Sequence, residues 1–360
     1  MSQLFSRCRI HTLTLPNRLV RSATAERLGD EDGRALPRQA EMYRELVRGG
    51  VGLIITGHLF VARSGIAHPE MVGIHDDSMI PSLAALAGAV HEEGGKIAAQ
   101  INHGGAQCFP EVVSDPMAPS AIESKMLRQP AREITTDEIE ELIDAYRQAA
   151  RRARQAGFDA VQIHAAHGYL ISEFLSPFVN RREDQWGGDR ARRRRMLQEV
   201  CRAVRREVGP DYPVFVKLGV IDGVEGGLTL HESLETVAEL ETLGLDAVEV
   251  SGGFGGRDLN SRAGVGKRVE EAYFREEVRA VRQATRLPVI MVGGMRSRRV
   301  MDEVLANNEA DFISLCRPLI CEPDLPNKLR TGKAETSACR SGNRCWPLAI
   351  GEGVRCREET

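Results

Sequence analysis

The stretch Ala156-Gly-Phe-Asp-Ala-Val-Gln-Ile-His164 passes from the end of a helical pattern through a glycine turn into a short apolar run. The same succession returns as Leu243-Gly-Leu-Asp-Ala-Val-Glu-Val-Ser251, and in looser form at 46–56 and 90–100. Apolar runs that are continuous, rather than alternating with polar residues, are typical of parallel strands buried on both faces. These stretches therefore predict repeated strand–helix units around a parallel sheet.

Eight apolar runs of this kind occur along the chain. They lie at 18–24, 51–56, 96–100, 160–164, 213–219, 247–251, 288–294 and 310–316. The segments between them read as helices, most clearly 136–150, with a Thr or Asp cap, and 230–243, with leucines on one stripe.

Eight alternations of strand and helix predict an α/β protein with the (β/α)8 TIM-barrel fold. A doubly wound sheet is the main alternative, but no Gly-x-Gly-x-x-Gly motif follows the first run. We expect a single barrel domain at 1–332, followed by a cysteine-containing tail at 333–360.

Composition excludes several classes of protein. The chain has 360 residues, 28% of them charged, and a formal net charge of -3, without the basic excess of nucleic-acid or membrane-surface proteins. No apolar stretch approaches the ~20 residues of a bilayer span, and the start lacks a signal-peptide pattern. The 8 cysteines are scattered, which favours a reducing, cytoplasmic setting. The sequence does not specify the oligomeric state and allows a homo-oligomer.

The ends of the last two runs predict a phosphate site. Gly293 and Gly294 follow the seventh run, and Cys316 and Arg317 follow the eighth. The loops after strands 7 and 8 of a TIM barrel commonly hold a phosphate, because glycine lets the backbone approach the anion and arginine adds a charge-assisted contact. The alternative is a tight turn beside a surface arginine.

The fourth run ends in three side chains suited to acid–base chemistry: His164, His167 and Tyr169. A His-x-x-His pair can bind zinc, but no third ligand is evident. Two imidazoles can instead donate hydrogen bonds to one oxygen, and a tyrosine hydroxyl can release a proton. The group suits an enzyme that polarises a carbonyl and protonates the neighbouring carbon.

Lys217 ends the fifth run, where an apolar residue would be usual. A cation at that position favours an anion on a bound ligand. The alternative is a lysine whose stem packs while its head reaches solvent.

The longest distinctive motif is HAAHGYLISEFLSPFVNRREDQWGG, from His164 to Gly188. With this motif, and with supporting segments at 16–24, 118–122, 288–294 and 310–319, the chain resembles the Old Yellow Enzyme family of FMN-dependent barrel oxidoreductases. The similarity covers nearly the whole chain.

The resemblance implies how FMN would be held. It places Ala23, Thr24 and Gly57 against the flavin ring. It places Gln100 at the pyrimidine edge, and Lys217 beside N1 and the C2 carbonyl. It places the phosphate against Gly293 and Gly294 and against the Cys316–Arg317 pair already described.

The resemblance also implies an activity. His164 and His167 would bind a substrate carbonyl oxygen, His164 also contacting the flavin, and Tyr169 would donate a proton. NAD(P)H would reduce FMN, which would then reduce a small-molecule alkene conjugated to a carbonyl. The alternatives are an oxidative FMN/iron–sulfur enzyme of the amine dehydrogenase type and a non-catalytic barrel that binds flavin or phosphate.

The tail departs from larger members of that family, which bind a [4Fe-4S] cluster through four cysteines. Cys339, Cys345 and Cys356 are present, but Gly342 stands in the second position. A cluster normally needs four protein ligands. We therefore expect a metal-free remnant, with the three thiols as weak metal candidates, and a single-flavin reductase that takes the nicotinamide directly. We expect the loops 106–133 and 257–268 to select the alkene.

Overall fold

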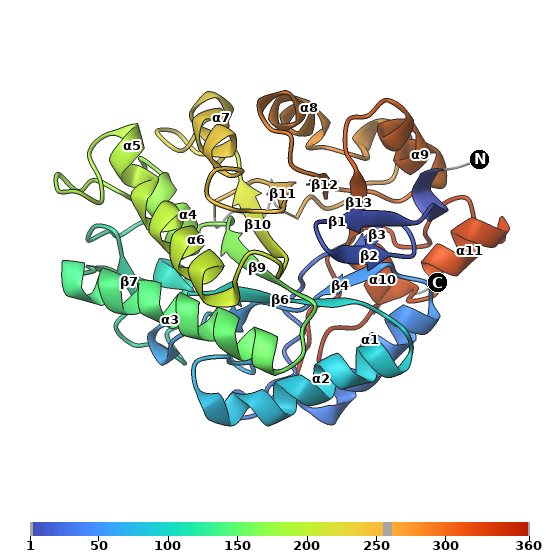
Figure 1. Ribbon diagram of the computed structural model, residues 1–360, viewed down its shortest axis with the longest axis horizontal. Coiled ribbons are helices and arrows are strands. Elements are labelled where there is room, and N and C mark those ends of the chain that lie inside the picture. Colours follow the sequence, from blue (N-terminus) through green and yellow to red (C-terminus); the bar gives the residue numbers. More distant parts are fainter. Residues whose placement is uncertain (1–2, 255–260, 359–360) are drawn as a thin grey trace.

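The computed structural model describes residues 3–254 and 261–358 (Figure 1). Eight parallel strands close into a ring, in which the last strand pairs with the first and β4 pairs with β6. The strands of the ring are β3 (Leu19–Arg21), β4 (Leu53–Ile55), β6 (Ile97–Asn102), β9 (Ala160–Ala165), β10 (Val214–Gly219), β11 (Ala247–Ser251), β12 (Val289–Met291) and β13 (Phe312–Leu315). The predicted TIM barrel is confirmed, and each strand lies within or across one of the predicted apolar runs.

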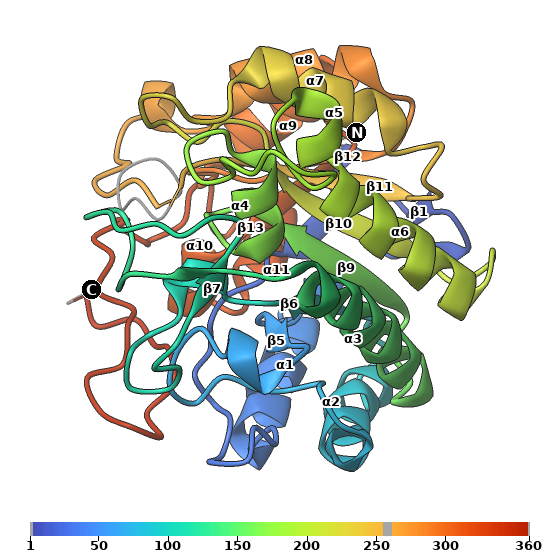
Figure 2. The ribbon, with the colours of Figure 1, turned by 90° about the vertical axis from the view of Figure 1, so that its left-hand side faces the viewer.

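The helices surround the strands on the outside of the ring (Figures 1 and 2). They are α1 (Pro37–Arg48), α2 (Ile80–Glu92), α3 (Thr136–Gln155), α4 (Leu170–Leu175), α5 (Arg190–Arg193), α6 (Arg195–Val208), α7 (Leu230–Glu239), α8 (Arg275–Ala284), α9 (Arg298–Ala306), α10 (Arg317–Cys321) and α11 (Leu325–Thr331). Among the described residues, no helix has the length and apolar character needed to span a bilayer.

Capping boxes fix the starts of the two helices that the sequence marked most clearly. Thr135 caps α3: its hydroxyl accepts from the backbone N–H of Glu138, whose carboxylate accepts from the backbone N–H of Thr135 at 2.8 Å. Thr229 and Glu232 repeat the arrangement at α7. The predicted helix at 230–243 is too long, because the chain tightens into a turn after Glu239.

An N-terminal hairpin closes the bottom of the barrel, a feature that the sequence analysis missed. Strands β1 (Cys8–Ile10) and β2 (Leu13–Leu15) pair antiparallel. Their apolar side chains form one cluster with the lowest layer inside the ring. That layer consists of Val20, Leu53, Ile55, Ala98, Ala160, Phe215, Ala247, Ile290 and Phe312. Small and large side chains together fill the interior in it, so the site must lie at the opposite end.

Residues 106–133, predicted as an excursion above the third strand, are tied down by the motif that follows β9. Strand β7 (Met117–Ala118) pairs with β8 (Arg132–Glu133). The buried guanidinium of Arg182 donates to the carbonyl oxygens of Pro119 at 2.9 Å and Ile134 at 2.7 Å, and pairs with Asp184 at 2.6 Å. This part of the motif therefore works as scaffold.

We expect Arg182→Ala to lower the free energy of unfolding by about 3–5 kcal/mol, because it leaves two buried carbonyls without their donor and breaks the ion pair with Asp184. Chemical denaturation measures the change. Arg192→Ala is the matched control, since Arg192 is exposed and pairs with Asp189 at 3.4 Å; it should cost less than ~1 kcal/mol. Equal losses in the two variants would contradict the scaffold role.

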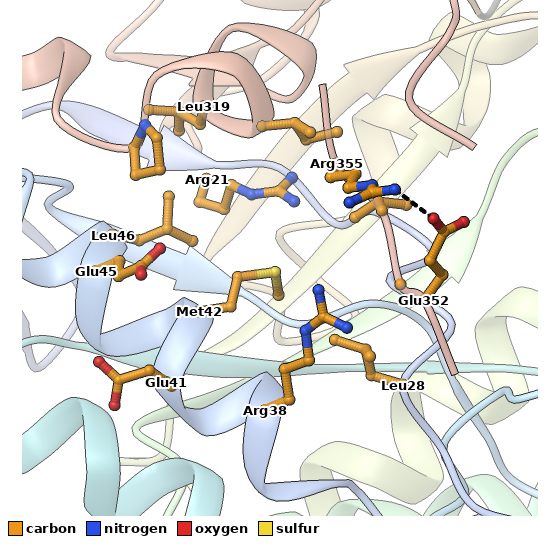
Figure 3. Close-up of a pocket in the computed structure, with 14 residues that line it drawn as sticks. Arg21, Leu28, Arg38, Glu41, Met42, Glu45, Leu46, Leu319, Glu352 and Arg355 are labelled. Atoms are coloured by element: carbon orange, nitrogen blue, oxygen red, sulfur yellow. Dashed lines mark hydrogen bonds and ion pairs between the residues drawn. The ribbon is translucent and has the colours of Figure 1, made fainter. Parts of the chain in front are cut away.

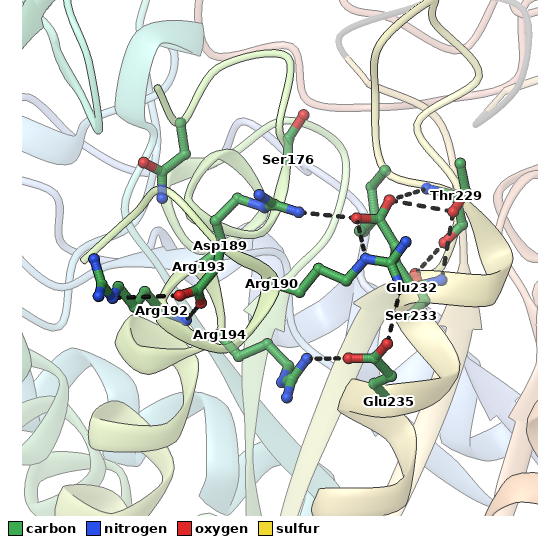
Figure 4. Close-up of polar contacts among 12 residues, drawn as sticks. Ser176, Asp189, Arg190, Arg192, Arg193, Arg194, Thr229, Glu232, Ser233 and Glu235 are labelled. Atoms are coloured by element: carbon green, nitrogen blue, oxygen red, sulfur yellow. Dashed lines mark hydrogen bonds and ion pairs between the residues drawn. The ribbon is translucent and has the colours of Figure 1, made fainter. Parts of the chain in front are cut away.

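The arginine-rich segment at α5 and the start of α6 is joined to α7 by ion pairs (Figure 4). Glu232 lies 3.1 Å from Arg190 and 2.8 Å from Arg193, and Glu235 lies 2.6 Å from Arg194. These cations are balanced by glutamates of the neighbouring helix.

After α11 the tail follows the outside of the molecule, in red in Figure 2. It is anchored at several points. The backbone N–H of Val354 donates to the carbonyl of Glu26 at 3.1 Å, and that of Gly264 donates to the carbonyl of Ser341 at 3.0 Å. The domain boundary at 332/333 stays a prediction.

Candidate functional site

Three side chains predicted to carry the chemistry meet at the mouth of the barrel. His164 is near the end of β9, and the chain then turns sharply to place His167 and Tyr169 beside it. The ring centroid of His164 lies 5.3 Å from that of His167 and 5.0 Å from that of Tyr169, both edge to face. The spacing predicted from the sequence therefore produces one cluster.

The environment of His164 fixes which ring nitrogen carries the proton. The backbone N–H of Ala166 donates to Nδ1 at 3.3 Å, so the hydrogen of the neutral ring lies on Nε2. Burial, and then the neighbouring His167, His58 and Lys217, hold the pKa of His164 well below its usual value. The side chain is therefore a neutral hydrogen-bond donor at pH 7.

His167 adopts a left-handed backbone conformation, with φ of 65°, which is uncommon for a residue other than glycine. This conformation is followed by Gly168, also at positive φ, and turns the ring back over the barrel. Its Nε2 lies 2.7 Å from the hydroxyl of Ser251 at the end of β11. Burial lowers the pKa of His167 to about 3, so this imidazole is also neutral.

A third histidine, His58, belongs to the same cluster and was left out of the predicted set. Its ring centroid lies 5.0 Å from that of Tyr169, and its Nε2 lies 3.2 Å from Nε2 of His68. His68 Nδ1 donates to the carbonyl of Pro69, so its Nε2 accepts from His58. The signal was present in the sequence, because His58 closely follows the second apolar run.

Above the apolar floor, the inside of the barrel carries a polar layer. Each of its members comes two residues after a residue of the floor, because side chains on a strand point inward at every second position. The layer consists of Ser22, Gln100, Gln162, Lys217, Glu249 and Ser314, all buried. The Gln100 amide donates to Gln162 at 2.7 Å, and the Gln162 amide donates to Glu249 at 3.0 Å.

Lys217 lies in this layer, and its partner corrects the expectation drawn from the sequence. Its ammonium donates to Ser22 at 2.8 Å and lies 3.2 Å from the carboxylate of Glu249. The anion beside Lys217 therefore belongs to the chain itself, whereas we had expected it on a bound ligand. The alternative of a head reaching solvent is also wrong, since Lys217 is buried.

The residues predicted to line one side of a flavin meet across the first, second and eighth strands. The Thr24 hydroxyl lies 3.1 Å from the sulfur of Cys316, and Ala23 packs against the apolar floor. A side chain at Gly57 would collide with the carbonyl of Thr24 and with Glu26. Gly57 is therefore required for this close approach of the two strands.

Glu26 is a buried carboxylate behind this side of the site. It accepts from the backbone N–H of Gly57 at 2.9 Å, and its other oxygen lies 3.7 Å from Arg21. Burial raises the pKa of Glu26 to about 7, although Arg21 opposes the shift. The folded protein therefore binds this proton more tightly than the unfolded chain does.

It follows that stability from Glu26 is complete below the ordinary pKa of 4.5 and is lost as pH rises through about 7. Relative to Glu26→Gln, the free energy of unfolding of the wild type should fall by about 1–3 kcal/mol between pH 5 and pH 8. Urea titrations at both pH values measure it, with the exposed Glu111→Gln as control. A pH-independent difference would contradict the shift.

The loops after the seventh and eighth strands have the backbone predicted for a phosphate site. Gly293 and Gly294 have φ of 122° and 67°, which glycine adopts readily. The ring of Tyr273, which the sequence analysis missed, packs against both glycines. Arg317 begins α10, and its Nη1 donates to the carbonyl of Arg262 at 2.7 Å and to Asn343 at 2.6 Å. The arginine is thus held between the loop that follows β11 and the tail; its role toward a phosphate stays a prediction.

These observations fit FMN. The polar layer offers amide and ammonium groups where the resemblance puts the pyrimidine edge, and Gly57 keeps Thr24 free of a neighbouring side chain. The paired glycines at positive φ leave backbone N–H groups without Cβ atoms beside them. The amide and ammonium groups thus suit the ring of a flavin, and the paired glycines at the end of the seventh strand lie where TIM barrels commonly hold a phosphate.

Cys321, at the end of α10, adds a fourth thiol near the tail; burial raises its pKa, and the neighbouring Cys356 and Cys339 raise it further. A side chain at Gly342, the second position of the expected motif, would collide with the carboxylate of Glu358. Within residues 3–254 and 261–358, no three His, Cys, Asp or Glu side chains are placed to hold a metal ion. The expected loss of the cluster stays a prediction, as do Cys339, Cys345 and Cys356 as weak metal candidates.

A separate cavity of about 340 Å³ lies between α1, α10 and the tail (Figure 3). Arg21, Met42 and Leu319 line its wall, and an ion pair between Arg355 and Glu352 lies at one side. None of the predicted site residues lines it. Of the two loops expected to select a substrate, 106–133 is described, whereas residues 257–260 of the loop at 257–268 lie outside the described residues.

Comparisons with known proteins show which family the chain matches. Residues 3–336 match the NADH:flavin oxidoreductase / NADH oxidase family. An NADH oxidase of Thermoanaerobacter brockii is 38% identical over 348 residues, which are 94% of this chain and 52% of that protein. The chain thus spans about half the length of this relative.

Two solved structures show the same fold. A 2-naphthoyl-CoA reductase in complex with 2-naphthoyl-CoA superposes with a TM-score of 0.88 at 29% identity, over 97% of this chain and 55% of that one. An old yellow enzyme homologue from Zymomonas mobilis superposes with a TM-score of 0.79 at 28% identity, over 93% of this chain and 94% of that one. The chain belongs to the NADH:flavin oxidoreductase / NADH oxidase family and is related to the Old Yellow Enzymes, with FMN as its cofactor.

Proposed function

We propose that this protein is an NAD(P)H-dependent ene-reductase, which reduces a C=C bond conjugated to a carbonyl group. The observation that carries the proposal is the cluster at the end of β9. The neutral imidazole of His164 lies with its ring centroid 5.3 Å from that of His167, also neutral, and 5.0 Å from the phenol of Tyr169, beside the polar layer that would face a flavin. Such a cluster offers donors for one oxygen and a proton for the adjacent carbon.

Bound FMN would supply the hydride chemistry that links NAD(P)H to the alkene. The residues that we propose to hold it are Ala23, Thr24, Gly57, Gln100, His164 and Lys217 at the ring, and Gly293, Gly294, Cys316 and Arg317 at the phosphate.

We assign the carbonyl oxygen of the substrate to His164 and His167. His164 donates from Nε2, because its Nδ1 already accepts from the backbone. Nε2 of His167 lies 2.7 Å from the Ser251 hydroxyl, which can donate to it, so we assign the N–H of this neutral ring that faces the substrate to Nδ1. Hydrogen bonds to the carbonyl oxygen draw electron density from the C=C bond. They make the alkene carbon farther from the carbonyl group a better hydride acceptor.

We assign the proton to Tyr169. Burial raises the pKa of its hydroxyl to about 12, so the group is protonated at pH 7. A carbon that has gained electron density beside a carbonyl is basic enough to take this proton. The neighbouring rings of His58 and His164 hold the phenol in place.

The proposal is tested with the FMN-loaded protein under anaerobic conditions. NAD(P)H should bleach the flavin absorption, and 2-cyclohexenone should restore it, whereas cyclohexanone, which lacks the C=C bond, should not. Bleaching without recovery by the enone would leave a flavin reductase with a different acceptor. A protein that cannot be loaded with FMN would favour the non-catalytic alternative.

We further propose a cytoplasmic setting, which the scattered cysteines support.

A further inference from the structure

Glu249 is the one carboxylate of the polar layer, and the proposed function gives it no role. Its side chain has no exposed surface. One carboxylate oxygen accepts from the hydroxyls of Ser22 at 2.7 Å and Ser314 at 2.9 Å, and lies 3.2 Å from the ammonium of Lys217. The other oxygen accepts from Gln162 at 3.0 Å. Every neighbour is therefore a donor, which is the environment of an ionised carboxylate.

The charge of Glu249 follows from these contacts. Burial by itself would raise its pKa, but Lys217 and three hydrogen bonds outweigh burial and hold the pKa below the usual value. Lys217 and Glu249 thus form an ion pair, buried on both sides, with no net charge.

Stability alone gives a weak reason for such a pair. Replacing a buried ion pair by apolar side chains is often neutral or stabilising, because two charges must be desolvated to form it. The layer directly below shows that the same strands accept apolar residues: Phe215 precedes Lys217 by two positions, and Ala247 precedes Glu249 by two. The pair therefore serves the site above it.

We propose that Glu249 is a positioning residue that anchors the ammonium of Lys217 and neutralises its charge toward the flavin, and so keeps the reduction potential of bound FMN low. The inference rests on the proposed function in one respect, since it takes Lys217 to lie beside the flavin. Reduction adds negative charge to the flavin near N1. A lone ammonium would stabilise that charge strongly, whereas an ammonium paired with a carboxylate stabilises it less.

A low potential has a direct consequence for catalysis. It makes the reduced flavin a stronger hydride donor to the alkene and the oxidised flavin a weaker acceptor from NAD(P)H. Glu249 would thus favour reduction of the alkene by the flavin over reduction of the flavin by NAD(P)H.

The test is the reduction potential of the FMN-loaded protein, measured by equilibration with a dye of known potential. Glu249→Gln keeps the shape of the side chain but leaves Lys217 unpaired. At a fixed dye potential, the ratio of reduced to oxidised flavin should rise about tenfold, which is ~30 mV for a two-electron couple. An unchanged or lower ratio would overturn the proposal.

Ser314→Ala is the matched control, because it removes one hydrogen bond from the same carboxylate without changing any charge. Its ratio should stay within twofold of the wild type. If Ser314→Ala shifts the ratio as far as Glu249→Gln does, hydrogen bonding rather than charge is responsible, and the proposal fails.

A second pair of variants covers the case in which Glu249→Gln does not fold. Lys217→Met leaves the carboxylate unbalanced and should lower the ratio about tenfold, and the double variant Lys217→Met/Glu249→Gln should return it to within twofold of the wild type. A double variant as low as Lys217→Met would overturn the charge-balance argument.

Rapid kinetics gives a readout that a merely structural role would not move. Glu249→Gln should speed flavin reduction by NAD(P)H and slow reoxidation by the enone, whereas damage to the fold would slow both. The dye measurement needs neither NAD(P)H nor an alkene. The measured reduction potential therefore tests the role of Glu249 even if the ene-reductase proposal is wrong.

Discussion

Tyr169→Phe should leave the reduction of bound flavin by NAD(P)H at its wild-type rate and slow alkene reduction about 100- to 10,000-fold, the range for loss of a general acid. The substitution removes only the hydroxyl. The ring can keep its contacts with His58 and His164, whose centroids both lie 5.0 Å away. Binding of the substrate should therefore change little, and the loss should fall on the proton transfer.

Anaerobic stopped-flow measurement of the two half-reactions checks this prediction. Tyr212→Phe is the control, because the Tyr212 hydroxyl donates to the backbone of Phe158, away from the cluster. Equal rates of alkene reduction in Tyr169→Phe and the wild type would assign the proton to another group. Slowing of both half-reactions would instead place Tyr169 in nicotinamide binding.

The double variant His164→Ala/His167→Ala should weaken the binding of phenols about 100- to 10,000-fold, and should abolish their charge-transfer absorption with the oxidised flavin. Phenols imitate the substrate because a phenolate oxygen accepts hydrogen bonds as the carbonyl oxygen would. Each hydrogen bond to a charged oxygen is worth about 1.5–3 kcal/mol, and the variant removes two donors.

Spectrophotometric titration with 4-hydroxybenzaldehyde measures the effect. His91→Ala, an exposed histidine of α2 that pairs with Asp159, controls for the loss of an imidazole elsewhere. The low pKa values of His164 and His167 also predict that phenolate binding does not gain from imidazole protonation between pH 6 and pH 8. An unchanged absorption band in the double variant would mean that the oxygen is bound elsewhere.

The motif that revealed the family has one part with the reactive side chains and another part that supports them. Its first six residues contain His164, His167 and Tyr169. Its later part holds the chain in place: Asn180 donates to the carbonyls of Phe174 and Trp186, each at 2.8 Å. Together with Arg182, this part fixes the loop over the barrel mouth. The resemblance was specific because the motif encodes both a reactive cluster and the framework that positions it.

The partner of Lys217 could not be predicted from the sequence pattern. The sequence placed a cation at the end of the fifth strand, and a ligand anion was the natural partner to expect. The structure supplies Glu249 from the next strand in the ring. The clue was a single acid inside the apolar run Val248-Glu-Val250, but its partner could not be read from the chain, because the two residues are joined only through strand pairing.

The sequence by itself determined the number and order of the strands, the helices between them and the strand ends that carry polar residues, since these follow from local periodicity and from turns. It also determined the cluster at His164, His167 and Tyr169, because those residues lie within six positions of one another. Only the tertiary structure decided which distant residues meet: the hairpin β1–β2 closing the barrel floor, His58 beside Tyr169, and the carboxylate of Glu249 beside Lys217. Contacts of this kind depend on the register between strands and on the inward side of each strand, and both are fixed only when the barrel closes.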